Sequence, residues 1–328
     1  MKKIGIKGTG AFLPERIVPN SYFEKIVDTS DEWIFSRTGI RERRMVLPGQ
    51  ALSDIATPAA EQALEMAGLS PLDLDMIIVG TSTADMPSPS AGCMIQYRLG
   101  AKNAVAFDVN AACPGFIYGL AVAQKFMQDG SHQHVLVVGS EIISQRTDFQ
   151  DRATCVLFGD GAGAVVLGPS NGKRDGEVLS VVINSDGNLW ELLHVPGGGS
   201  LYPISHEMIE ARLHYVKMQG NEVFKHAVRA MADAVRKTLD TSGFSAKEIN
   251  WFIPHQANIR IMTSVAKQLG IPMEKVIVTV HKFGNTSAAT IPTALDEAVR
   301  SGQIQRGDLV LATSFGAGFT WGAILFRF

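Results

Sequence analysis

The sequence predicts an α/β fold made of two similar halves, and three observations carry this prediction. First, the chain has 328 residues, more than the roughly 250–300 at which a single hydrophobic core usually stops growing. Second, short apolar runs alternate with segments of helical periodicity, as in proteins with parallel sheets. Third, the pattern of the first half returns later, with Ile4 corresponding to Leu179 and Gly68 to Gly243, a spacing of 175 residues.

The expected strands are short apolar runs, and most of these runs are rich in Val and Ile. In chain order these runs are Met76–Gly80, Ala104–Val109, Val135–Val138, Ala164–Leu167, Leu179–Ile183, Trp251–Ile253, Val276–Val280, Leu309–Ala312 and Ala323–Phe326. The expected helices lie between most of these strands, at Pro58–Met66, Cys93–Leu99, Gly115–Gln128, Val223–Thr241, Arg260–Leu269 and Ile291–Val299. Thr81–Ser90 contains two prolines and is expected to be irregular, and Pro169–Gly176 is expected to link the halves.

The repeat extends over several segments of the chain. The further matches at the same spacing are Gly68–Ile78 with Gly243–Ile253, Asn110 with Asn285, and His134–Val138 with Leu309–Thr313. Gly163–Leu167 matches Gly322–Phe326 at a shorter spacing, which indicates an extra loop near residues 141–158. We therefore expect duplicated halves at residues 1–173 and 174–328. Ligands of open α/β sheets bind beyond the carboxyl ends of strands, so the site is expected between matching strand ends.

Composition argues against several classes of protein. With 30 Lys and Arg against 32 Asp and Glu, the net charge is −2, which is not the basic balance typical of nucleic-acid binding. The hydrophobic content of 46% argues against disorder as the main state. No run approaches about 18 apolar residues, and the start of the chain lacks the apolar segment of a signal peptide. We therefore expect a cytoplasmic protein without membrane insertion.

Metal and nucleotide sites are not expected either. The cysteines have no paired spacing, which argues against a disulfide framework and fits a reducing cytosol. His132 and His134, and the pair His206–Glu207, are not followed by further ligands at a familiar spacing. Gly159–Gly163 resembles part of a dinucleotide fingerprint, but it leads into an expected strand, whereas a true fingerprint opens a helix.

Cys113 is the first candidate for chemistry. An expected strand ends at Val109 and a helix begins near Pro114, a residue suited to the first helical turn. Cys113 is therefore expected at a helix N-terminus, where the dipole and free N–H groups favour a thiolate that can attack thioesters. A buried structural cysteine is the alternative for Cys113, and it is the role expected for Cys93 and Cys155.

His255 and Asn285 each follow the end of an expected strand. Taken singly, His255 could be a loop histidine and Asn285 a helix N-cap. With Cys113 they form a Cys/His/Asn set from three strand ends related by the repeat. The His–Asn pair offers neutral hydrogen-bond donors for a thioester oxygen, which suits decarboxylation of a malonyl thioester. A Cys-His-Asn set also serves papain-like proteases, so the set alone leaves the class open.

Several motifs along the chain resemble one family. They are Thr29–Ile34, Arg37–Ile40, Cys113–Phe116, Gly159–Gly163, His255–Asn258, Gly284–Ala288 and Phe315–Gly322. In order and over nearly the whole chain, they resemble β-ketoacyl-[acyl-carrier-protein] synthase III. The resemblance implies a thiolase-like fold of two duplicated βαβαβαββ halves in five α-β-α-β-α layers, and a homodimer. It also implies the initiating step of type II fatty acid synthesis, in which acetyl-CoA and malonyl-carrier protein give acetoacetyl-carrier protein, CO₂ and CoA.

The resemblance further implies roles for individual residues. Cys113 is expected to be the acylated nucleophile, and His255 and Asn285 are expected to stabilise the malonyl enolate. The backbone N–H groups of Cys113 and Ala317 are expected to form the oxyanion hole. Substrate contacts are implied for Trp33, Arg37 and Arg152 at the adenine and phosphate end of CoA, Asn258 and Gly220 along the pantetheine arm, and Phe315 as a gate. Coenzyme A thioesters are expected as substrates, and no cofactor is expected to be bound permanently.

Two surface features concern the partner and the starter. Arg260 and Lys267 lie seven residues apart on one expected helix, so they share a face that, with Lys225, could contact an acidic carrier protein. An ordinary solvated face is the alternative. In the family an aromatic residue of the partner subunit often closes the acyl pocket, but here Ser88 takes that place. Either the pocket is longer, or Met86 closes it instead. Priming by acyl groups larger than acetyl is therefore a hypothesis.

Other readings of the residues are weaker. A related condensing enzyme that uses a longer or unusual starter in a secondary pathway is the main alternative. A degradative thiolase would need a second cysteine near the C-terminus, and no cysteine lies beyond Cys155. A non-catalytic scaffold is disfavoured by the intact Cys/His/Asn set.

Overall fold

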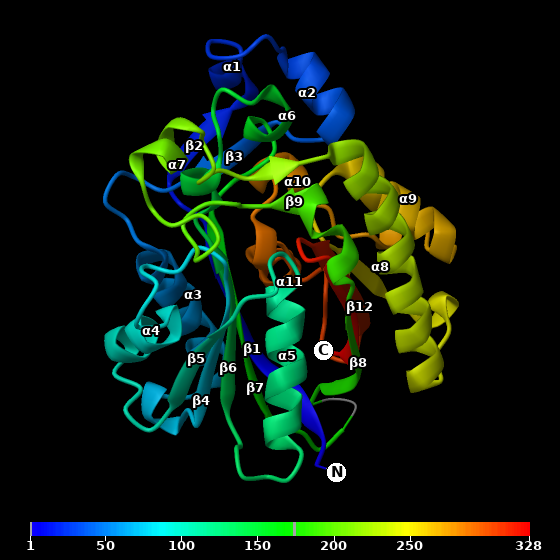
Figure 1. The fold of residues 1–328 in the computed structure, drawn as a ribbon. Helices are drawn as coiled ribbons and strands as arrows, with labels where there is room; N and C mark the ends of the chain where they lie inside the picture. Colours follow the sequence, from blue (N-terminus) through cyan, green and yellow to red (C-terminus); the bar gives the residue numbers. More distant parts are fainter. Residues whose placement is uncertain (1, 173–174) are drawn as a thin grey trace.

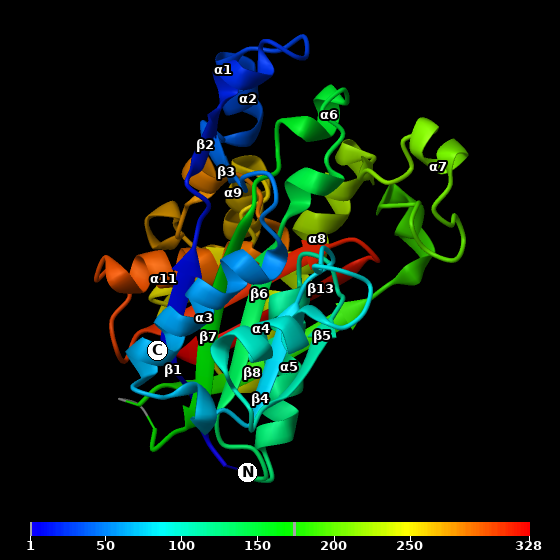
Figure 2. The ribbon, with the colours of Figure 1, turned by 90° about the vertical axis from the view of Figure 1, so that its left-hand side faces the viewer.

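The helices and strands form five layers in the order helices, sheet, helices, sheet, helices (Figures 1 and 2). The computed structural model describes residues 2–172 and 175–328. The expected boundary between residues 173 and 174 lies outside these described residues. The α/β class predicted from the alternating pattern is therefore confirmed.

The first sheet has five strands in the order β1-β7-β6-β4-β5. Its strands are β1 (Ile4–Phe12), β4 (Met76–Gly80), β5 (Val105–Val109), β6 (Val135–Glu141) and β7 (Gly161–Pro169). Strand β4 lies parallel to both β5 and β6, whereas β7 is antiparallel to β6 and β1. Helix α3 (Leu52–Ala67) packs on the outer face with α4 (Ala91–Leu99).

The second sheet has four strands in the order β11-β12-β13-β8. Its strands are β8 (Glu177–Ser185), β11 (Trp251–Pro254), β12 (Leu309–Gly316) and β13 (Thr320–Arg327). Its order matches that of β4, β6, β7 and β1 in the first sheet, and the directions of pairing match as well. Helices α8 (Gly220–Ser242) and α9 (Ile259–Leu269) cover its outer face.

The middle layer consists of α5 (Gly115–Met127) and α11 (Thr290–Arg300), which contact strands of both sheets. The cluster around them joins apolar side chains of both sheets, for example Ile78 from β4 and Val310 from β12. Full burial of an aliphatic side chain of this kind stabilises a fold by about 1.5–3 kcal/mol. The shared core therefore fixes how the two sheets, and the strand ends at one edge of each, face one another.

Shorter elements gather above these strand ends, at the top of Figure 1. They are β2 (Arg16–Pro19), α1 (Asn20–Phe23), α2 (Asp31–Thr38), β3 (Glu42–Met45), α6 (Arg152–Cys155), β9 (Leu193–His194), α7 (His206–Glu210), β10 (Lys217–Met218) and α10 (Val280–Phe283). The expected extra loop near residues 141–158 contributes α6 to this region. Within the residues described, no helix has the length and apolar character needed to cross a membrane.

The expected strand Val276–Val280 is wrong. Val276 makes only an isolated bridge to Phe252, and Val280 begins α10. The side chain of Gln256 explains the difference, because it hydrogen-bonds the backbone where a neighbouring strand would pair. Its Nε2 donates to the Ile277 oxygen at 3.1 Å, and its Oε1 accepts from the Thr279 nitrogen at 2.8 Å.

Two further differences concern β1 and α3. Strand β1 is absent from the expected strands, because its three glycines are typical of loops. In the structure these glycines allow close packing against α3. A Cβ on Gly8, for example, would lie 2.1 Å from the Ala63 oxygen. Helix α3 begins at Leu52 and not at Pro58. Its first turn is stabilised by the Asp54 carboxylate, which accepts from the Ala51 nitrogen at 2.7 Å.

Candidate active site

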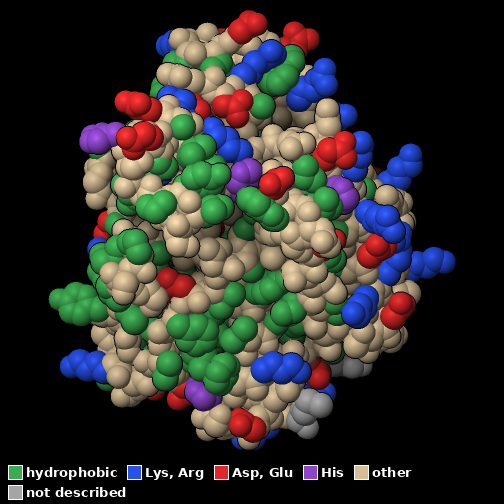
Figure 3. Space-filling model, in the orientation of Figure 1, with side chains coloured by type: hydrophobic (Ala, Val, Ile, Leu, Met, Phe, Trp, Pro, Cys, Tyr) green, Lys and Arg blue, Asp and Glu red, His purple; other side chains and the backbone are tan. Residues whose placement is uncertain are grey.

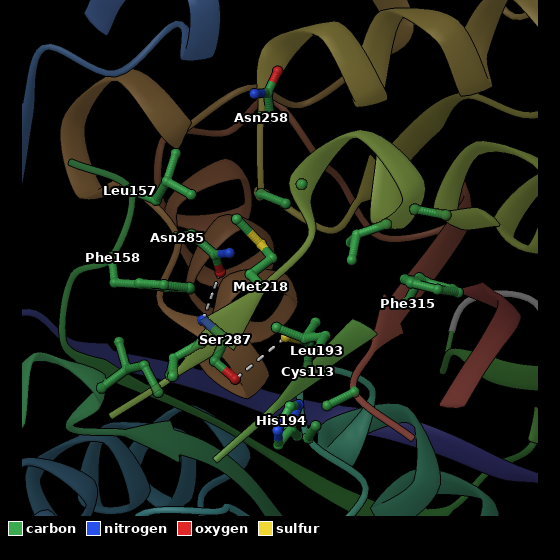
Figure 4. A pocket seen from close by; sticks show the side chains of 18 of the residues that line it. Cys113, Leu157, Phe158, Leu193, His194, Met218, Asn258, Asn285, Ser287 and Phe315 are labelled. Atoms are coloured by element: carbon green, nitrogen blue, oxygen red, sulfur yellow. Dashed lines mark hydrogen bonds between the residues drawn. The ribbon is translucent and has the colours of Figure 1, made fainter. Parts of the chain in front are cut away.

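A cavity of about 1410 Å³ opens where the strand ends of the two sheets face each other. Cys113, His255 and Asn285 all line it, so the structure brings the predicted Cys/His/Asn set together. Side chains of the short elements also line the cavity, among them Leu193, His194 and Met218 (Figure 4). On the molecular surface, a hollow bordered by hydrophobic side chains lies in the middle of the face shown in Figure 3.

Cys113 lies between β5 and the first turn of α5, as predicted. Ala112 has a φ of 50°, an uncommon conformation for a residue with a Cβ, and its oxygen accepts from the Gly115 nitrogen at 2.8 Å. Gly316 of β12 packs against this turn, and a Cβ there would lie 2.8 Å from the Cys113 nitrogen. The turn and the close approach of β12 together direct the Cys113 side chain into the cavity.

The expectation of a thiolate at Cys113 is not met, because the pKa of the thiol is raised. Burial raises the pKa of the Cys113 thiol to about 11, and the negative charge of Glu141 raises it further, while a hydrogen bond from Ser287 lowers it. Desolvation of the charged form is the largest of these influences on the pKa. The resting group is a neutral thiol, so a proton must leave Cys113 before it can act as a nucleophile.

His255 follows β11 directly and is buried. Its backbone nitrogen donates to the Thr313 oxygen at 2.8 Å, and its Nδ1 lies 2.7 Å from the Thr290 hydroxyl. Burial lowers the pKa of His255 to about 3, so the ring is neutral at ordinary pH. With a hydroxyl rather than a carboxylate as partner, the Thr290 O–H can donate to Nδ1 and leave a proton on Nε2.

Asn285 is held on three sides. Its backbone nitrogen donates to the Leu157 oxygen at 2.9 Å, and its backbone oxygen accepts from the Gly159 nitrogen at 3.0 Å. Its side-chain Oδ1 accepts from the Ser287 nitrogen at 2.9 Å (Figure 4). With Oδ1 occupied in this way, the Nδ2 group of Asn285 is directed away from Ser287 and remains a donor.

Most of the other predicted site residues also line the cavity. They are Trp33, Arg37, Gly220, Asn258, Phe315 and Ala317, together with Lys225 and Arg260 of the predicted carrier-protein patch. Arg152 is not part of the lining, but its guanidinium lies 4.2 Å from the centre of the Trp33 ring. Lys267 lies in the last turn of α9, away from the cavity. Figure 3 shows that Lys and Arg side chains gather on the side of the molecule formed by α8 and α9.

Ser88 and Met86 lie in the irregular segment before α4, and neither lines the cavity of the single chain. The proposed effect of this segment concerns the pocket of a partner subunit. The hypothesis of an enlarged starter pocket therefore stays a prediction. Of the remaining cysteines, Cys155 is buried, as expected, and lies in α6, whereas Cys93 is only half-buried.

The sequence reasoning missed Ser287 and Glu141. The Ser287 hydroxyl lies 3.5 Å from Cys113 Sγ, and Glu141 lies behind it, fully buried at the end of β6. A signal for Glu141 was present, because it is a charged residue only three positions after the apolar run Val135–Val138. Ser287 follows the candidate Asn285 by two residues, and only the structure turns it towards Cys113.

The glycine motif Gly159–Gly163 runs into β7, the strand that was expected after it.

Comparison with known proteins then decides the family. The model of the 3-oxoacyl-[acyl-carrier-protein] synthase III C-terminal region matches residues 239–328, and the model of the synthase III family itself matches residues 107–187. A β-ketoacyl-[acyl-carrier-protein] synthase III of Caldanaerobacter subterraneus subsp. tengcongensis is 50% identical over 98% of this chain and 97% of its own.

The chain belongs to the β-ketoacyl-[acyl-carrier-protein] synthase III family. A synthase III of Clostridioides difficile is 49% identical over 98% of this chain and 97% of its own. The crystal structure of 3-oxoacyl-[acyl-carrier-protein] synthase III from Aquifex aeolicus VF5 matches with a TM-score of 0.92 and 47% identity, covering 99% of this chain and 100% of that one. The fold is the thiolase-like fold of this family, and the chain is an acyltransferase of fatty acid biosynthesis.

Proposed function

We propose that the chain condenses acetyl-CoA with malonyl-acyl-carrier protein to give acetoacetyl-carrier protein, CO₂ and CoA. The observation that carries this proposal is the meeting of Cys113, His255 and Asn285 in one cavity of a synthase III fold. The set contains a nucleophile and two neutral donors, which are the groups that acyl transfer and a decarboxylative condensation require. A secondary-pathway enzyme with an unusual starter is not favoured, since the relatives about half identical to this chain carry the synthase III name.

In the first half-reaction, Cys113 attacks the thioester carbonyl and becomes acylated. The backbone N–H groups of Cys113 and Ala317 receive the oxyanion. Their proximity is supported by Thr320, whose hydroxyl lies 2.8 Å from the oxygens of both Ala111 and Ala317 and so connects the two loops. Preorganised N–H donors of this kind are each worth about 2.7–4 kcal/mol in transition-state stabilisation.

In the second half-reaction, His255 and Asn285 hold the thioester oxygen of the malonyl group. Loss of CO₂ places negative charge on that oxygen, and no base is needed to create the enolate. The lowered pKa of His255, to about 3, supports this role because a neutral imidazole donates one hydrogen bond without giving up a proton. The enolate carbon then attacks the acyl group on Cys113, and Cys113 leaves as a thiolate.

Coenzyme A is proposed to enter past α2. Trp33 with Arg37 and Arg152 would take its adenine and phosphate end, a placement supported by the position of Arg152 over the Trp33 ring. The pantetheine arm would pass Asn258 and Gly220, which line the cavity. Phe315 packs against Phe319, with ring centres 4.6 Å apart and ring planes tilted by 51°, and it would gate the inner end of the pocket.

The carrier protein is proposed to dock on the basic side formed by α8 and α9. Lys225, Arg260 and Lys267 would contact its acidic surface. Lys225 already pairs with Glu222 at 2.7 Å, and Arg260 lies over Phe224 with 5.8 Å between guanidinium and ring centre. Exposed pairs of this kind contribute little stability, so they can be exchanged for contacts to a partner at small cost.

The remaining expectations complete the proposal. The chain would act as a homodimer in the cytoplasm, with coenzyme A thioesters as substrates and no permanently bound cofactor. The halves 1–173 and 174–328 would be the duplicated units. Ser88 or Met86 of one subunit would set the length of the partner's acyl pocket.

The proposal is tested by mass spectrometry of the intact protein with acetyl-CoA, followed by turnover with malonyl-carrier protein and with malonyl-CoA. We expect one acetyl group on Cys113 and faster turnover with the carrier protein. A series of acyl-CoA chain lengths tests the starter, since a sharp preference for acetyl would contradict the enlarged pocket. A protein that never becomes acylated would refute the mechanism.

A further inference from the structure

Behind Cys113 lies a buried carboxylate for which the proposed reaction has no use. Glu141 ends β6 and is completely inaccessible to solvent. Its Oε1 accepts from the nitrogen and the hydroxyl of Ser82 at 3.0 and 2.9 Å, and its Oε2 accepts from the Thr83 hydroxyl and, at 3.4 Å, from Thr81. A buried carboxylate without a cationic partner is costly to keep, so its position calls for a physical explanation.

Ser287 connects this carboxylate to the nucleophile. Its Oγ lies 3.5 Å from Cys113 Sγ and 3.4 Å from Glu141 Oε1. The hydroxyl has one proton, so when it donates to Glu141 its oxygen is free to accept from the Cys113 thiol. The distances are longer than tight hydrogen bonds, and contacts of this kind shorten when substrate is bound.

The backbone holds Ser287 in place for this contact. Its φ is 51°, in the left-handed region that costs a side-chain-bearing residue free energy, and Asn285 Oδ1 accepts its N–H at 2.9 Å. Figure 4 shows the Ser287 side chain between Asn285 and Cys113, with the hydroxyl pointing at the sulfur. The strained turn thus fixes the middle atom of a chain that runs from sulfur through hydroxyl to carboxylate.

The surroundings of Glu141 allow its carboxyl group to bind and release a proton near neutral pH. Burial raises the pKa of Glu141 to about 7, against the lowering effect of the hydrogen bonds from Thr83, Ser82 and Ser287. In the described part of the chain, its hydrogen-bonding neighbours are hydroxyl and amide groups, and the titratable group that faces it is Cys113. His255 is a much poorer proton acceptor, because burial lowers its pKa to about 3.

We propose that Ser287 and Glu141 form a proton relay that takes the thiol proton of Cys113 during acylation. As Sγ bonds to the thioester carbonyl carbon, the thiol proton moves to Ser287 Oγ and the Ser287 proton moves to Glu141. When the tetrahedral intermediate collapses, the bond from carbon to the CoA sulfur breaks. The proton then returns from Glu141 through Ser287 to that sulfur, so that CoA leaves as the thiol and Glu141 is again a carboxylate.

The inference rests on the proposed acylation of Cys113, and it makes a prediction opposite to simple electrostatics. The negative charge of Glu141 raises the pKa of the Cys113 thiol. If Glu141 acted only through its charge, Glu141→Gln would ease thiolate formation and speed acylation. If Glu141 accepts the proton, the same substitution slows acylation, because glutamine keeps the shape but cannot take a proton.

The test is the rate of Cys113 acylation by acetyl-CoA in single turnovers between pH 6 and 10, for the wild type and for Glu141→Gln and Ser287→Ala. In the wild type the rate should rise through about pH 7 and then level off. Each variant should acylate about 10²-fold more slowly at pH 8 and should recover as pH rises towards 10, where the thiol ionises unaided. The double variant should be no slower than the single ones, because the two residues act as a unit.

Asp160→Asn is the matched control. Asp160 is a second buried carboxylate with a raised pKa and a serine hydroxyl partner, Ser144, but it does not line the cavity. Its substitution should leave the pH profile of acylation unchanged. Thermal unfolding of Glu141→Gln, compared with that of the wild type, shows whether the variant is folded under the conditions of the rate measurement.

Acylation of Glu141→Gln at or above the wild-type rate, with the same pH profile, would overturn the relay. An equal slowing at every pH would overturn it too, because it indicates a purely structural role. A wild type that is never acylated would instead refute the proposed function itself, so the two failures are distinguishable.

Discussion

The two halves of the molecule use the same backbone turn for different chemistry. In the first half the turn after β5 places Ala112 at φ 50°, and in the second half the turn before α11 places Ser287 at φ 51°. The two residues are separated by the repeat spacing of 175, as are Asn110 and Asn285. Corresponding hydrogen bonds close both turns, from the Gly115 nitrogen to the Ala112 oxygen and from the Thr290 nitrogen to the Ser287 oxygen. The shared geometry lies in the backbone, and the functional difference lies in the side chains.

The strand ends that face these turns differ in a complementary way. Strand β12 ends at Gly316, whose missing side chain lets the backbone approach Cys113, whereas β6 ends at Glu141, which reaches the Ser287 turn. Strand β4 ends at Gly80, against Gly115, whereas β11 is followed by His255. The strand ends beside the Cys113 turn are thus glycines, and those beside the Ser287 turn carry or precede polar side chains. The comparison predicts that substitutions in the first half can impair acylation without impairing decarboxylation, and that substitutions in the second half can do the reverse.

The largest effect is expected from substitution of Cys113, the proposed nucleophile. Cys113→Ala should lower condensation by roughly 10⁵–10⁶-fold, because no acyl group can be held. It should still release CO₂ from malonyl-carrier protein, since His255 and Asn285 are unchanged. Acylation is measured by intact mass and CO₂ release with labelled malonate. Loss of both condensation and CO₂ release in a folded Cys113→Ala protein would contradict the assignment of the two half-reactions to different halves.

The next largest effect is expected from substitutions that slow decarboxylation but leave acylation of Cys113 intact. His255→Ala or Asn285→Ala should slow decarboxylation by about 10²–10³-fold each while Cys113 is still acylated by acetyl-CoA. Asn110→Ala removes the counterpart of Asn285 in the first half and should slow decarboxylation far less. Equal losses for Asn110→Ala and Asn285→Ala would show that the repeat extends to the chemistry as well as to the backbone.

A smaller effect is expected from Gly316→Ala. The added Cβ would lie 2.8 Å from the Cys113 nitrogen and 3.0 Å from its Cβ, so the turn must move. We expect about 1–3 kcal/mol of destabilisation, measured by denaturant unfolding, together with slower acylation. Gly187→Ala is the control, because a Cβ there meets no atom within 4 Å. An unchanged stability for Gly316→Ala would contradict the role of close packing.

The smallest effect concerns pH. Because burial lowers the pKa of His255 to about 3, the rate of decarboxylation should show no inflection from His255 between pH 5 and pH 8. The unfolded chain protonates this histidine near the ordinary histidine pKa of 6.5, so its contribution to stability is present above that pH and is lost progressively towards pH 3. Acid unfolding of the wild type and His255→Gln should therefore diverge below pH 6.5. An inflection of the rate near pH 6.5 would indicate a protonated imidazole and contradict the neutral donor.

The strands and helices with strong periodicity were predictable, and the exceptions have identifiable causes. Strand β1 was missed because its glycines serve packing against α3 and not a turn. The segment Val276–Val280 has the composition of a strand, but the side chain of Gln256 takes the hydrogen bonds that a neighbouring strand would supply. Both errors arise from contacts between segments distant in sequence, which local patterns do not contain.

Strand ends, glycines and motifs are local features of the chain, so the amino-acid sequence was enough to predict the duplicated α/β order, the three strand-end residues Cys113, His255 and Asn285, and the family. The ionisation of the site depends instead on how the whole chain packs. A helix terminus favours a thiolate, yet burial raises the pKa of the Cys113 thiol to about 11, since desolvation depends on everything packed around the sulfur. The tertiary structure also placed Ser287 of the second half between Cys113 and Glu141 of the first, because these contacts require two sheets from different halves to share one core.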